Sequence, residues 1–200
     1  MTERVSFHFD PGCPWAWQAS KWIREVANQT AIEIDWRLFS LALINDSGAD
    51  PLADEHAKST VALRSLVLAR RVAGNDGVGR AYAAMGSLTF ETFERDDRLS
   101  PEVAKAALEE AGFGPSIVDQ ALNDASTMDD VRAEHLSAVE QVGCFGVPTI
   151  MLESGKGIFG PVVAHAPEGR DAVHLWNRVR WLIERDEFFE LKRERDRKPG

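Results

Sequence analysis

The chain has 200 residues, of which 44% are hydrophobic and 28% charged, and its formal net charge is −9. This length and composition fit one globular domain, or one domain with an insertion, that can bury a core without disulfides. The negative net charge argues against a nucleic-acid backbone or an anionic membrane surface as the main partner. No stretch approaches the roughly 20 apolar residues of a membrane-spanning helix. We therefore expect no nucleic-acid partner and no membrane partner.

The N-terminal residues and the cysteine usage indicate a reducing compartment. Met1-Thr2-Glu3-Arg4 leads directly into a strand pattern, without the apolar stretch and cleavage site of a signal peptide. The two cysteines, Cys13 and Cys144, are far apart in the sequence and do not suggest a disulfide framework. We expect a cytoplasmic protein.

The first forty residues follow a strand, helix, strand pattern. Residues 5–10 alternate apolar and polar side chains, and Asp10-Pro11-Gly12 interrupts them. Apolar residues at helical spacing predict a helix over 14–28, and strict alternation predicts a strand over 32–38. Short connections between these elements predict a right-handed βαβ unit.

Helical patterns fill the middle of the chain. A helix is expected near 61–70 and a second over 81–93, and the glycine-rich residues 74–79 between them are predicted to form a loop. Because these glycines follow a helix rather than a strand, they do not indicate a phosphate-binding loop. Three more helices are expected, one opened by Ser100-Pro101, one from Pro115 and one over 128–142.

The strand pattern returns after this helical block. Strands are expected over 147–152 and 158–161, with a turn between them, and a last helix over 168–185. The order βαβ, helices, ββα predicts an α/β domain that is split by an all-helical insertion. The predicted boundaries place residues 1–48 and 144–200 in the α/β domain and residues 49–143 in the insertion.

Cys13 begins the first helix, directly after the strand. The unpaired N–H groups and the dipole of a helix N-terminus favour negative charge, so the pKa of this thiol is expected below the usual value of about 8.5. Pro14 suits the first helical turn because its missing N–H would have no partner there. Cys13 is therefore a candidate nucleophile, and the alternative is a small buried apolar residue.

A second candidate segment, Gly146-Val147-Pro148-Thr149, precedes a predicted strand. X–Pro bonds adopt the cis form far more readily than other peptide bonds. A cis bond here would leave the backbone groups of Val147 to pair with an extended substrate. The alternative is an ordinary proline at the entry to a strand.

These segments together resemble the mycothiol-dependent nitroreductase family of actinobacterial, DsbA-like thioredoxin-fold proteins with a helical insertion. The similar segments, in chain order, are Phe9 to Trp17, Ser40 to Asn45, Tyr82 to Gly86, Val147 to Thr149, Phe159 to Pro161 and Phe188 to Arg193. The resemblance implies that Cys13 is the redox nucleophile, that Pro148 is a facing cis-proline and that mycothiol is the co-substrate thiol. The expected substrate-binding residues are Pro14, Trp15, Asn45, Tyr82, Val147, Pro148 and Thr149.

The chain departs from the dithiol members of this family at one position. Those members have Cys-Pro-Trp-Cys, whereas this chain has Ala16 at the second cysteine position. Without a resolving thiol, a mixed disulfide at Cys13 must wait for an external thiolate, so a single-cysteine route is expected. Cys144 precedes Pro148 by four residues and could resolve instead, but a buried structural thiol is the favoured interpretation.

The leading hypothesis is a thiol-dependent oxidoreductase that acts on disulfide or nitroaromatic-like electrophiles. One alternative is a transferase or isomerase similar to the kappa class, which has serine at the nucleophile position. Another is a non-catalytic relative that binds thiols or extended peptides. The five histidines, at positions 8, 56, 135, 165 and 174, lack metal-ligand spacing, so no metal is expected. The composition would permit a homodimer without requiring one.

Overall fold

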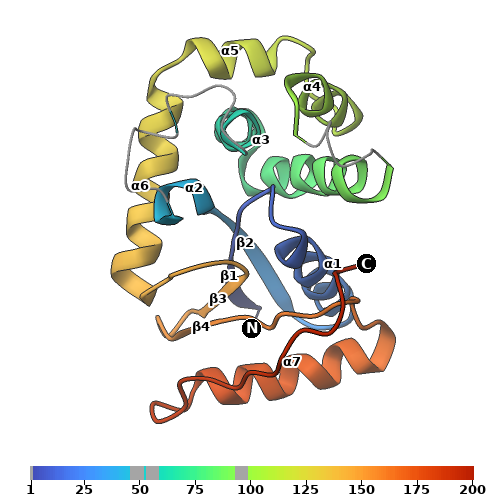
Figure 1. Cartoon of the computed structure of the whole chain (residues 1–200), viewed down its shortest axis with the longest axis vertical. Helices are drawn as coiled ribbons and strands as arrows, with labels where there is room; N and C mark the ends of the chain where they lie inside the picture. The colour runs from blue at the N-terminus through green and yellow to red at the C-terminus, as the bar shows by residue number, and fades with distance from the viewer. Residues whose placement is uncertain (1, 46–51, 53–58, 93–98) are drawn as a thin grey trace. The chain divides into compact units, whose positions relative to one another are not determined.

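The computed structural model of the chain describes residues 2–45, 52, 59–92 and 99–200. The chain divides into two compact units. The sheet unit comprises Met1–Phe9, Cys13–Arg37 and Ala138–Gly200, and the helical unit comprises Asp10–Gly12 and Leu38–Ser137. The predicted boundary between residues 48 and 49 lies outside the described residues. The mixed α/β class with many helices is confirmed (Figure 1).

The sheet unit is built around four strands in the order β2-β1-β3-β4. Its elements are β1 (Glu3–Phe9), α1 (Pro14–Gln29), β2 (Ile32–Leu38), β3 (Thr149–Leu152), β4 (Gly157–Phe159) and α7 (Gly169–Ile183). Strand β3 pairs antiparallel with β1, from Val5 opposite Leu152 to His8 opposite Thr149, and also antiparallel with β4. β3 begins one residue after Pro148, which has no N–H to donate to a strand ladder.

The apolar positions of the first strand and helix form the core of this unit. Phe7 and Phe9 are fully buried and meet the ring of Trp36 edge-on, at centroid distances of 5.4 and 6.0 Å. On α1, Trp22 is also fully buried, lies near Trp176 of α7 and donates to Ala172 O at 3.0 Å. The helical spacing of apolar residues in α1 and α7 therefore produces the contact between these two helices.

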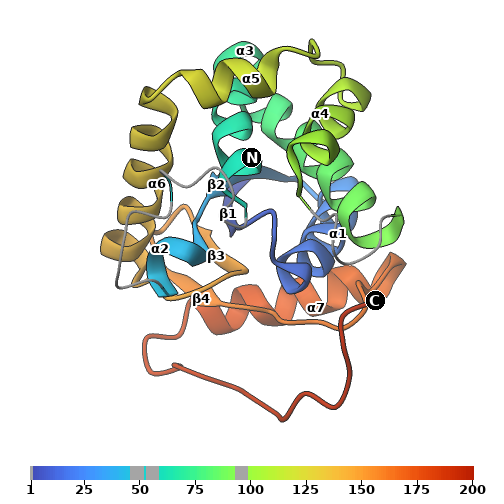
Figure 2. The same ribbon diagram turned by 45° about the horizontal axis from the view of Figure 1, so that its top comes forward.

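Apart from Leu38, the last residue of β2, the regular elements in the described part of the helical unit are helices. They are α2 (Leu41–Asn45), α3 (Thr60–Ser87), the π-helix η1 (Leu88–Thr92), α4 (Pro101–Glu110), α5 (Ile117–Asn123) and α6 (Ser126–Val142), whose last residues belong to the sheet unit (Figure 2). The predicted cap of α4 is confirmed, because the side chain of Ser100 accepts from Val103 N at 3.3 Å.

The prediction of a loop at residues 74–79 is wrong. Both helices expected on either side belong to α3, which continues through a kink where Ala73 and Gly74 leave helical geometry. A Cβ at Gly77 would lie 2.7 Å from the backbone oxygen of Ala69, so only glycine permits this close approach. Gly77 thus serves packing within the helix, and Gly74 supplies the positive φ of the kink. The predicted end at Phe93 lies outside the described residues.

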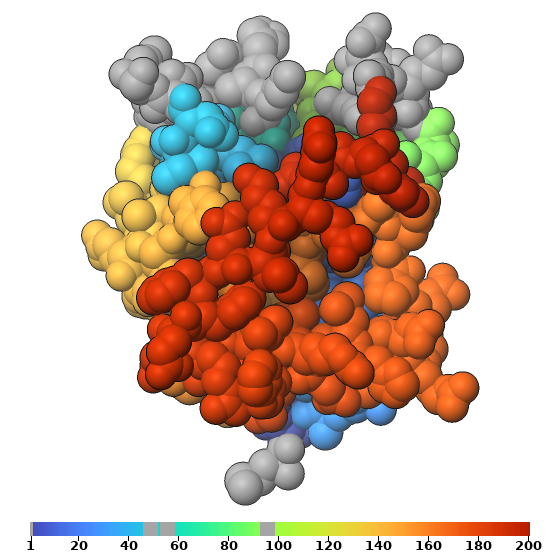
Figure 3. Space-filling model, turned by 60° about the horizontal axis from the view of Figure 1, so that its bottom comes forward, coloured from blue at the N-terminus to red at the C-terminus, as the bar shows by residue number. Residues whose placement is uncertain are grey.

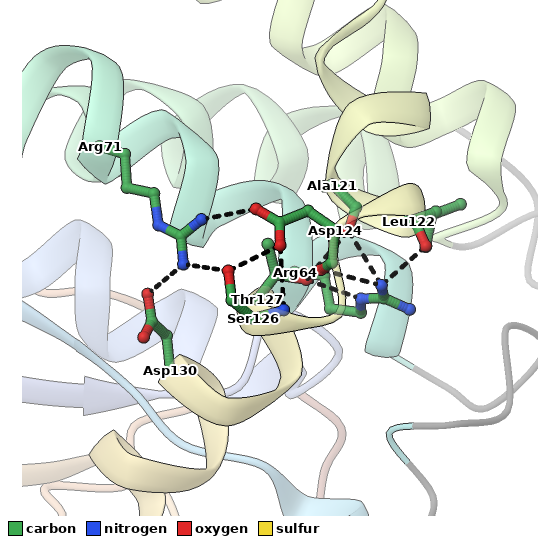
Figure 4. Close-up of polar contacts among 8 residues, drawn as sticks. All are labelled: Arg64, Arg71, Ala121, Leu122, Asp124, Ser126, Thr127 and Asp130. Carbon is green, nitrogen blue, oxygen red and sulfur yellow. Dashed lines mark hydrogen bonds and ion pairs between the residues drawn. The ribbon is translucent and has the colours of Figure 1, made fainter.

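Two arginines of α3 hold the junction between α5 and α6 (Figure 4). Arg64 is 3% exposed and donates to the carbonyl oxygens of Ala121 and Leu122 at 2.9 and 2.8 Å. These carbonyls end α5 and have no partner within the helix, so the guanidinium satisfies them. Arg71 pairs with Asp124 and Asp130 at 2.8 and 2.7 Å. The amphipathic pattern did not reveal this network, because its acceptors lie more than fifty residues away.

Candidate active site

Cys13 is the N-cap residue of α1. Its backbone is extended, with φ −90° and ψ 110°, and its carbonyl accepts from Trp17 N at 3.0 Å. The N–H of Ala16 donates to Cys13 Sγ at 3.4 Å. Pro14 occupies the first turn, as the pattern predicted. The sulfur therefore takes the place that a serine or aspartate oxygen has in an ordinary helix cap.

The loop before β3 reaches the same sulfur. Cys13 Sγ donates to Val147 O at 3.7 Å, although these residues are 134 positions apart. The Val147–Pro148 peptide bond is cis, and Pro148 O accepts from Gly160 N at 2.8 Å. Cys13, Val147 and Pro148 all belong to the sheet unit. The structure thus brings together the two segments that the sequence marked as candidates.

The contacts of the Cys13 sulfur act on its ionisation in opposite directions. The Ala16 N–H and the other unpaired amides of the first turn favour the thiolate. The bond to Val147 O exists only while the thiol is protonated, because a carbonyl can only accept. Cys13 is 6% exposed, so an electrophile needs local movement to reach the sulfur. The site can present a sulfur nucleophile to an electrophile held against the prolyl loop.

Cys144 lies at the start of the same loop in different surroundings. It is 3% exposed, and its Sγ donates to Gly146 O at 3.1 Å. Thr149 Oγ1 donates to the same carbonyl at 2.8 Å. Burial raises the pKa of the Cys144 thiol, and its hydrogen bonds with Thr149 and Gly146 oppose that shift. Neither cysteine forms a disulfide.

The remaining predicted substrate-binding residues are distributed over both units. Trp15, half-buried on α1, and Thr149, 2% exposed on β3, belong to the sheet unit. Asn45 ends α2 in the helical unit, where its exposed side chain donates to Leu41 O at 2.7 Å. Tyr82 is fully buried on α3 in the same unit. A role in substrate binding stays a prediction for these four residues, and also for Pro14, Val147 and Pro148.

Asp10 organises the turn after β1, a role that sequence reasoning missed. Its Oδ1 accepts from Gly12 N and its Oδ2 from Leu41 N, both at 2.8 Å, all within the helical unit. Burial raises the pKa of the Asp10 carboxyl, against the hydrogen bonds from Ser59, Leu41 and Gly12. The Asp-Pro-Gly sequence carried the local part of this signal, since aspartate accepts from the N–H two residues on. The bond to Leu41 had no sequence signal.

His8 is a buried titratable group that the alternating pattern placed on the polar face of β1. It is 4% exposed, and among the described residues neither ring nitrogen has a hydrogen-bond partner. Burial, aided by the charge of Arg37 and opposed by Asp35, lowers the pKa of His8 to about 4. His8 is therefore a neutral imidazole at physiological pH, opposite Thr149 in the sheet register.

The described residues contain neither the ligand cluster of a metal site nor a membrane-spanning helix. Among residues 2–45, 52, 59–92 and 99–200, three or more His, Cys, Asp or Glu side chains nowhere gather as metal ligands. A helix with the length and hydropathy to cross a bilayer is likewise absent from the described part of the chain.

The strand order, the helix that begins at Cys13 and the prolyl loop define a DsbA-like protein with the thioredoxin fold. Solved structures share this fold at low sequence identity. A probable DsbA oxidoreductase, SCO1869 from Streptomyces coelicolor, has a TM-score of 0.63 and 19% identity, covering 97% of this chain and 94% of its own. The cytosolic disulfide reductase DsbM from Pseudomonas aeruginosa has a TM-score of 0.58 and 15% identity, covering 89% of this chain and 99% of its own.

Sequence similarity then assigns the family. Residues 12–193 match the family of the mycothiol-dependent nitroreductase Rv2466c, and the chain belongs to this family. The chain is also 38% identical over 191 residues to the uncharacterized protein Rv2286c of Mycobacterium tuberculosis (strain ATCC 25618 / H37Rv). That match covers 94% of this chain and 81% of the relative. The resemblance that the sequence motifs indicated is confirmed, and so is the thioredoxin-like fold.

Proposed function

We propose that this protein is a thiol-dependent oxidoreductase in which Cys13 is the single nucleophile and mycothiol is the co-substrate thiol. The observation that carries the proposal is the position of the Cys13 sulfur at the N-cap of α1, 3.4 Å from Ala16 N and 3.7 Å from Val147 O. Membership of the nitroreductase family supports the choice of mycothiol. Trp15, Pro14 and the Val147–Thr149 segment would contact the substrate, and Asn45 and Tyr82 are included from the resemblance alone.

The proposed route on a disulfide R–S–S–R′ has two exchange steps. The Cys13 thiolate attacks one sulfur, a Cys13–S–S–R bond forms, and R′–S⁻ leaves and takes a proton from solvent. A mycothiol thiolate then attacks the R sulfur, which releases the Cys13 thiolate and the mixed disulfide of mycothiol and R. Each step exchanges one S–S bond for another, so no further reductant is required.

On a nitroaromatic acceptor the same sulfur would supply half of the electrons. Reduction of a nitro group to a nitroso group takes two electrons and two protons and releases one water. Oxidation of Cys13 and one mycothiol to a mixed disulfide supplies those electrons and protons. A second mycothiol then exchanges with that disulfide, regenerates Cys13 and leaves oxidised mycothiol.

The route uses a single cysteine because neither position 16 nor Cys144 offers a second reactive thiol. Ala16 stands where dithiol relatives have their second cysteine, and burial raises the pKa of Cys144. Low thiolate content makes Cys144 a poor attacking group. An external thiol is therefore the proposed resolving agent. The mechanism needs Cys13 kept reduced, so we place the activity in a reducing compartment, the cytoplasm.

The test is turnover of a disulfide and of a nitroaromatic with mycothiol, for the wild type, Cys13→Ser and Cys144→Ser. We expect Cys13→Ser to lose at least about a hundredfold in rate, because serine is far less ionised and less nucleophilic. Cys144→Ser should stay within about twofold of the wild type. Mass spectrometry of the wild type should show one mycothiol adduct, located on Cys13.

Two outcomes would replace the proposal. Full activity of Cys13→Ser in a thiol-conjugation assay would favour a transferase similar to the kappa class. An adduct on Cys13 without turnover of either substrate would favour a thiol-binding protein.

A further inference from the structure

The segment after α7 turns back, and the C-terminal end of this segment reaches the neighbourhood of α1 (Figures 1 and 2). We call residues Asp186–Gly200 the strap; within the sheet unit it runs without helix or strand from the end of α7 to the neighbourhood of α1 (Figures 1 and 2). In the space-filling view it lies on the surface as a red band (Figure 3). The strap is held near α1 at two places, Arg195 and Gly200.

Arg195 covers the aromatic ring that follows the nucleophile. Its guanidinium carbon lies 4.9 Å from the centroid of the Trp15 ring. A guanidinium in this position is attracted by the negative face of the indole and can stack on it. Trp15 stands only two residues after Cys13, so the covered ring adjoins the proposed reaction centre in the chain.

Gln18, one helical turn beyond Trp15, holds the far end of the strap. Its side chain, 2% exposed, donates through Nε2 to Gly200 O and accepts through Oε1 from Ala166 N at 3.2 Å. Gly200 N donates to Ala164 O at 2.9 Å. The last residue of the strap, Gly200, is thus held by hydrogen bonds to Gln18 and to Ala164.

Most of the strap buries little apolar surface. Phe189 and Leu191 are 85% and 84% exposed, so lifting the segment would uncover little core. The contact of Arg195 with Trp15 is a surface cation–π interaction, which is weak enough for a ligand to displace. A planar aromatic ring would use the same indole face, because aromatic rings stack at similar distances.

We propose that Arg195 is a specificity-determining residue: a planar aromatic acceptor must displace its guanidinium from Trp15, whereas a small aliphatic electrophile reaches Cys13 without doing so. The proposal rests on the proposed function in taking Cys13 as the reacting sulfur and Trp15 as part of the substrate site. Its new element is that Arg195 competes with an aromatic substrate for the face of the Trp15 ring.

The matched control is another arginine of the strap. Arg197 pairs through its guanidinium with Asp196 at 2.7 and 2.8 Å and is mostly exposed. Replacing Arg197 removes the same charge from the same segment and leaves the contact with Trp15 intact. Any effect of net charge alone should therefore appear equally in both variants.

The experiment compares the rates at which N-phenylmaleimide and iodoacetamide modify Cys13 in the full chain carrying Cys144→Ser. Arg195→Ala should raise the rate with N-phenylmaleimide about two- to fivefold, the range that a surface cation–π contact allows. The iodoacetamide rate should change by less than about 1.5-fold on the same reasoning. Arg197→Ala should leave both rates unchanged, and Arg195→Lys should lie between the wild type and Arg195→Ala.

An unchanged ratio of the two rates in Arg195→Ala would overturn the proposal, as would an equal change in Arg197→Ala. A fall in the N-phenylmaleimide rate would also overturn it, because Arg195 would then help to bind the reagent. Thermal unfolding of each variant detects a loss of folding. The ratio of the two alkylation rates does not depend on turnover with mycothiol. Failure of the proposal about Arg195 and failure of the oxidoreductase proposal therefore give different results.

Discussion

The two cysteines of the sheet unit show how differently one fold can treat the same side chain. Cys13 caps a helix, where an N–H from Ala16 points at its sulfur. Cys144 lies in a loop, where its thiol donates to Gly146 O and burial raises its pKa. Both are nearly inaccessible, so exposure does not distinguish them. The N–H of Ala16 distinguishes them, because it points at the Cys13 sulfur and favours the anion there, whereas burial raises the pKa of Cys144.

We expect the largest effect from a second thiol placed beside Cys13. In Ala16→Cys the new sulfur lies one turn into α1, where it can attack a mixed disulfide on Cys13. We expect the Cys13–mycothiol adduct of the wild type to persist for minutes or longer without added thiol, and the adduct of the variant to disappear at least about tenfold faster. Mass spectrometry of acid-quenched samples follows both.

Ala16 is fully buried, so the added sulfur must fit into packed surroundings. The melting temperature of reduced Ala16→Cys shows whether the variant is folded, and Ala16→Ser serves as a size-matched control without a thiol. The adduct of folded Ala16→Cys could instead be as long-lived as that of the wild type. The missing thiol at position 16 would then not be the reason for the single-cysteine route.

His8 is another buried titratable group of the sheet unit, and it lies opposite Thr149, next to the Cys144 loop. Its pKa is about 4 in the folded protein and near 6.5 when unfolded, so the unfolded chain binds more protons between these values. Its contribution to stability is complete above about pH 6.5 and is lost as pH falls through 4. The loss should approach about 3 kcal/mol, and His8→Leu should lack it.

Urea unfolding at pH 7, 5.5 and 4 measures this effect as the difference between wild type and variant. Burial raises the pKa of Asp10, which gives a slope of opposite sign that cancels in the difference. Equal pH dependence in His8→Leu and the wild type would show that His8 titrates normally.

Local signals explain why much of the fold could be predicted from the sequence. The alternation in residues 5–9 and 32–38 and the helical spacing after Pro14 depend on neighbouring residues only, and so does the cap at Ser100. The glycines at 74–79 misled the prediction because Gly74 forms a kink and Gly77 permits a close approach within α3, which composition does not distinguish from a loop.

The candidate site shows the same division between local and distant information. The helix-start cysteine and the Val-Pro-Thr segment were recognisable as motifs, but only the structure gives the contact between Cys13 Sγ and Val147 O. The burial of His8 depends on what packs over β1, and the position of Arg195 depends on the path of the strap back to α1. Neither has a periodic signature.

We propose that the amides at the start of α1 favour the thiolate of Cys13 near neutral pH. The most direct measurement is the rate of iodoacetamide alkylation of Cys13 from pH 5 to 10, in the Cys144→Ser protein. We expect a midpoint clearly below about 8.5, the value of an ordinary cysteine, with the full rate reached near neutral pH. A midpoint at or above that value would show that the amides of α1 do not stabilise the Cys13 thiolate.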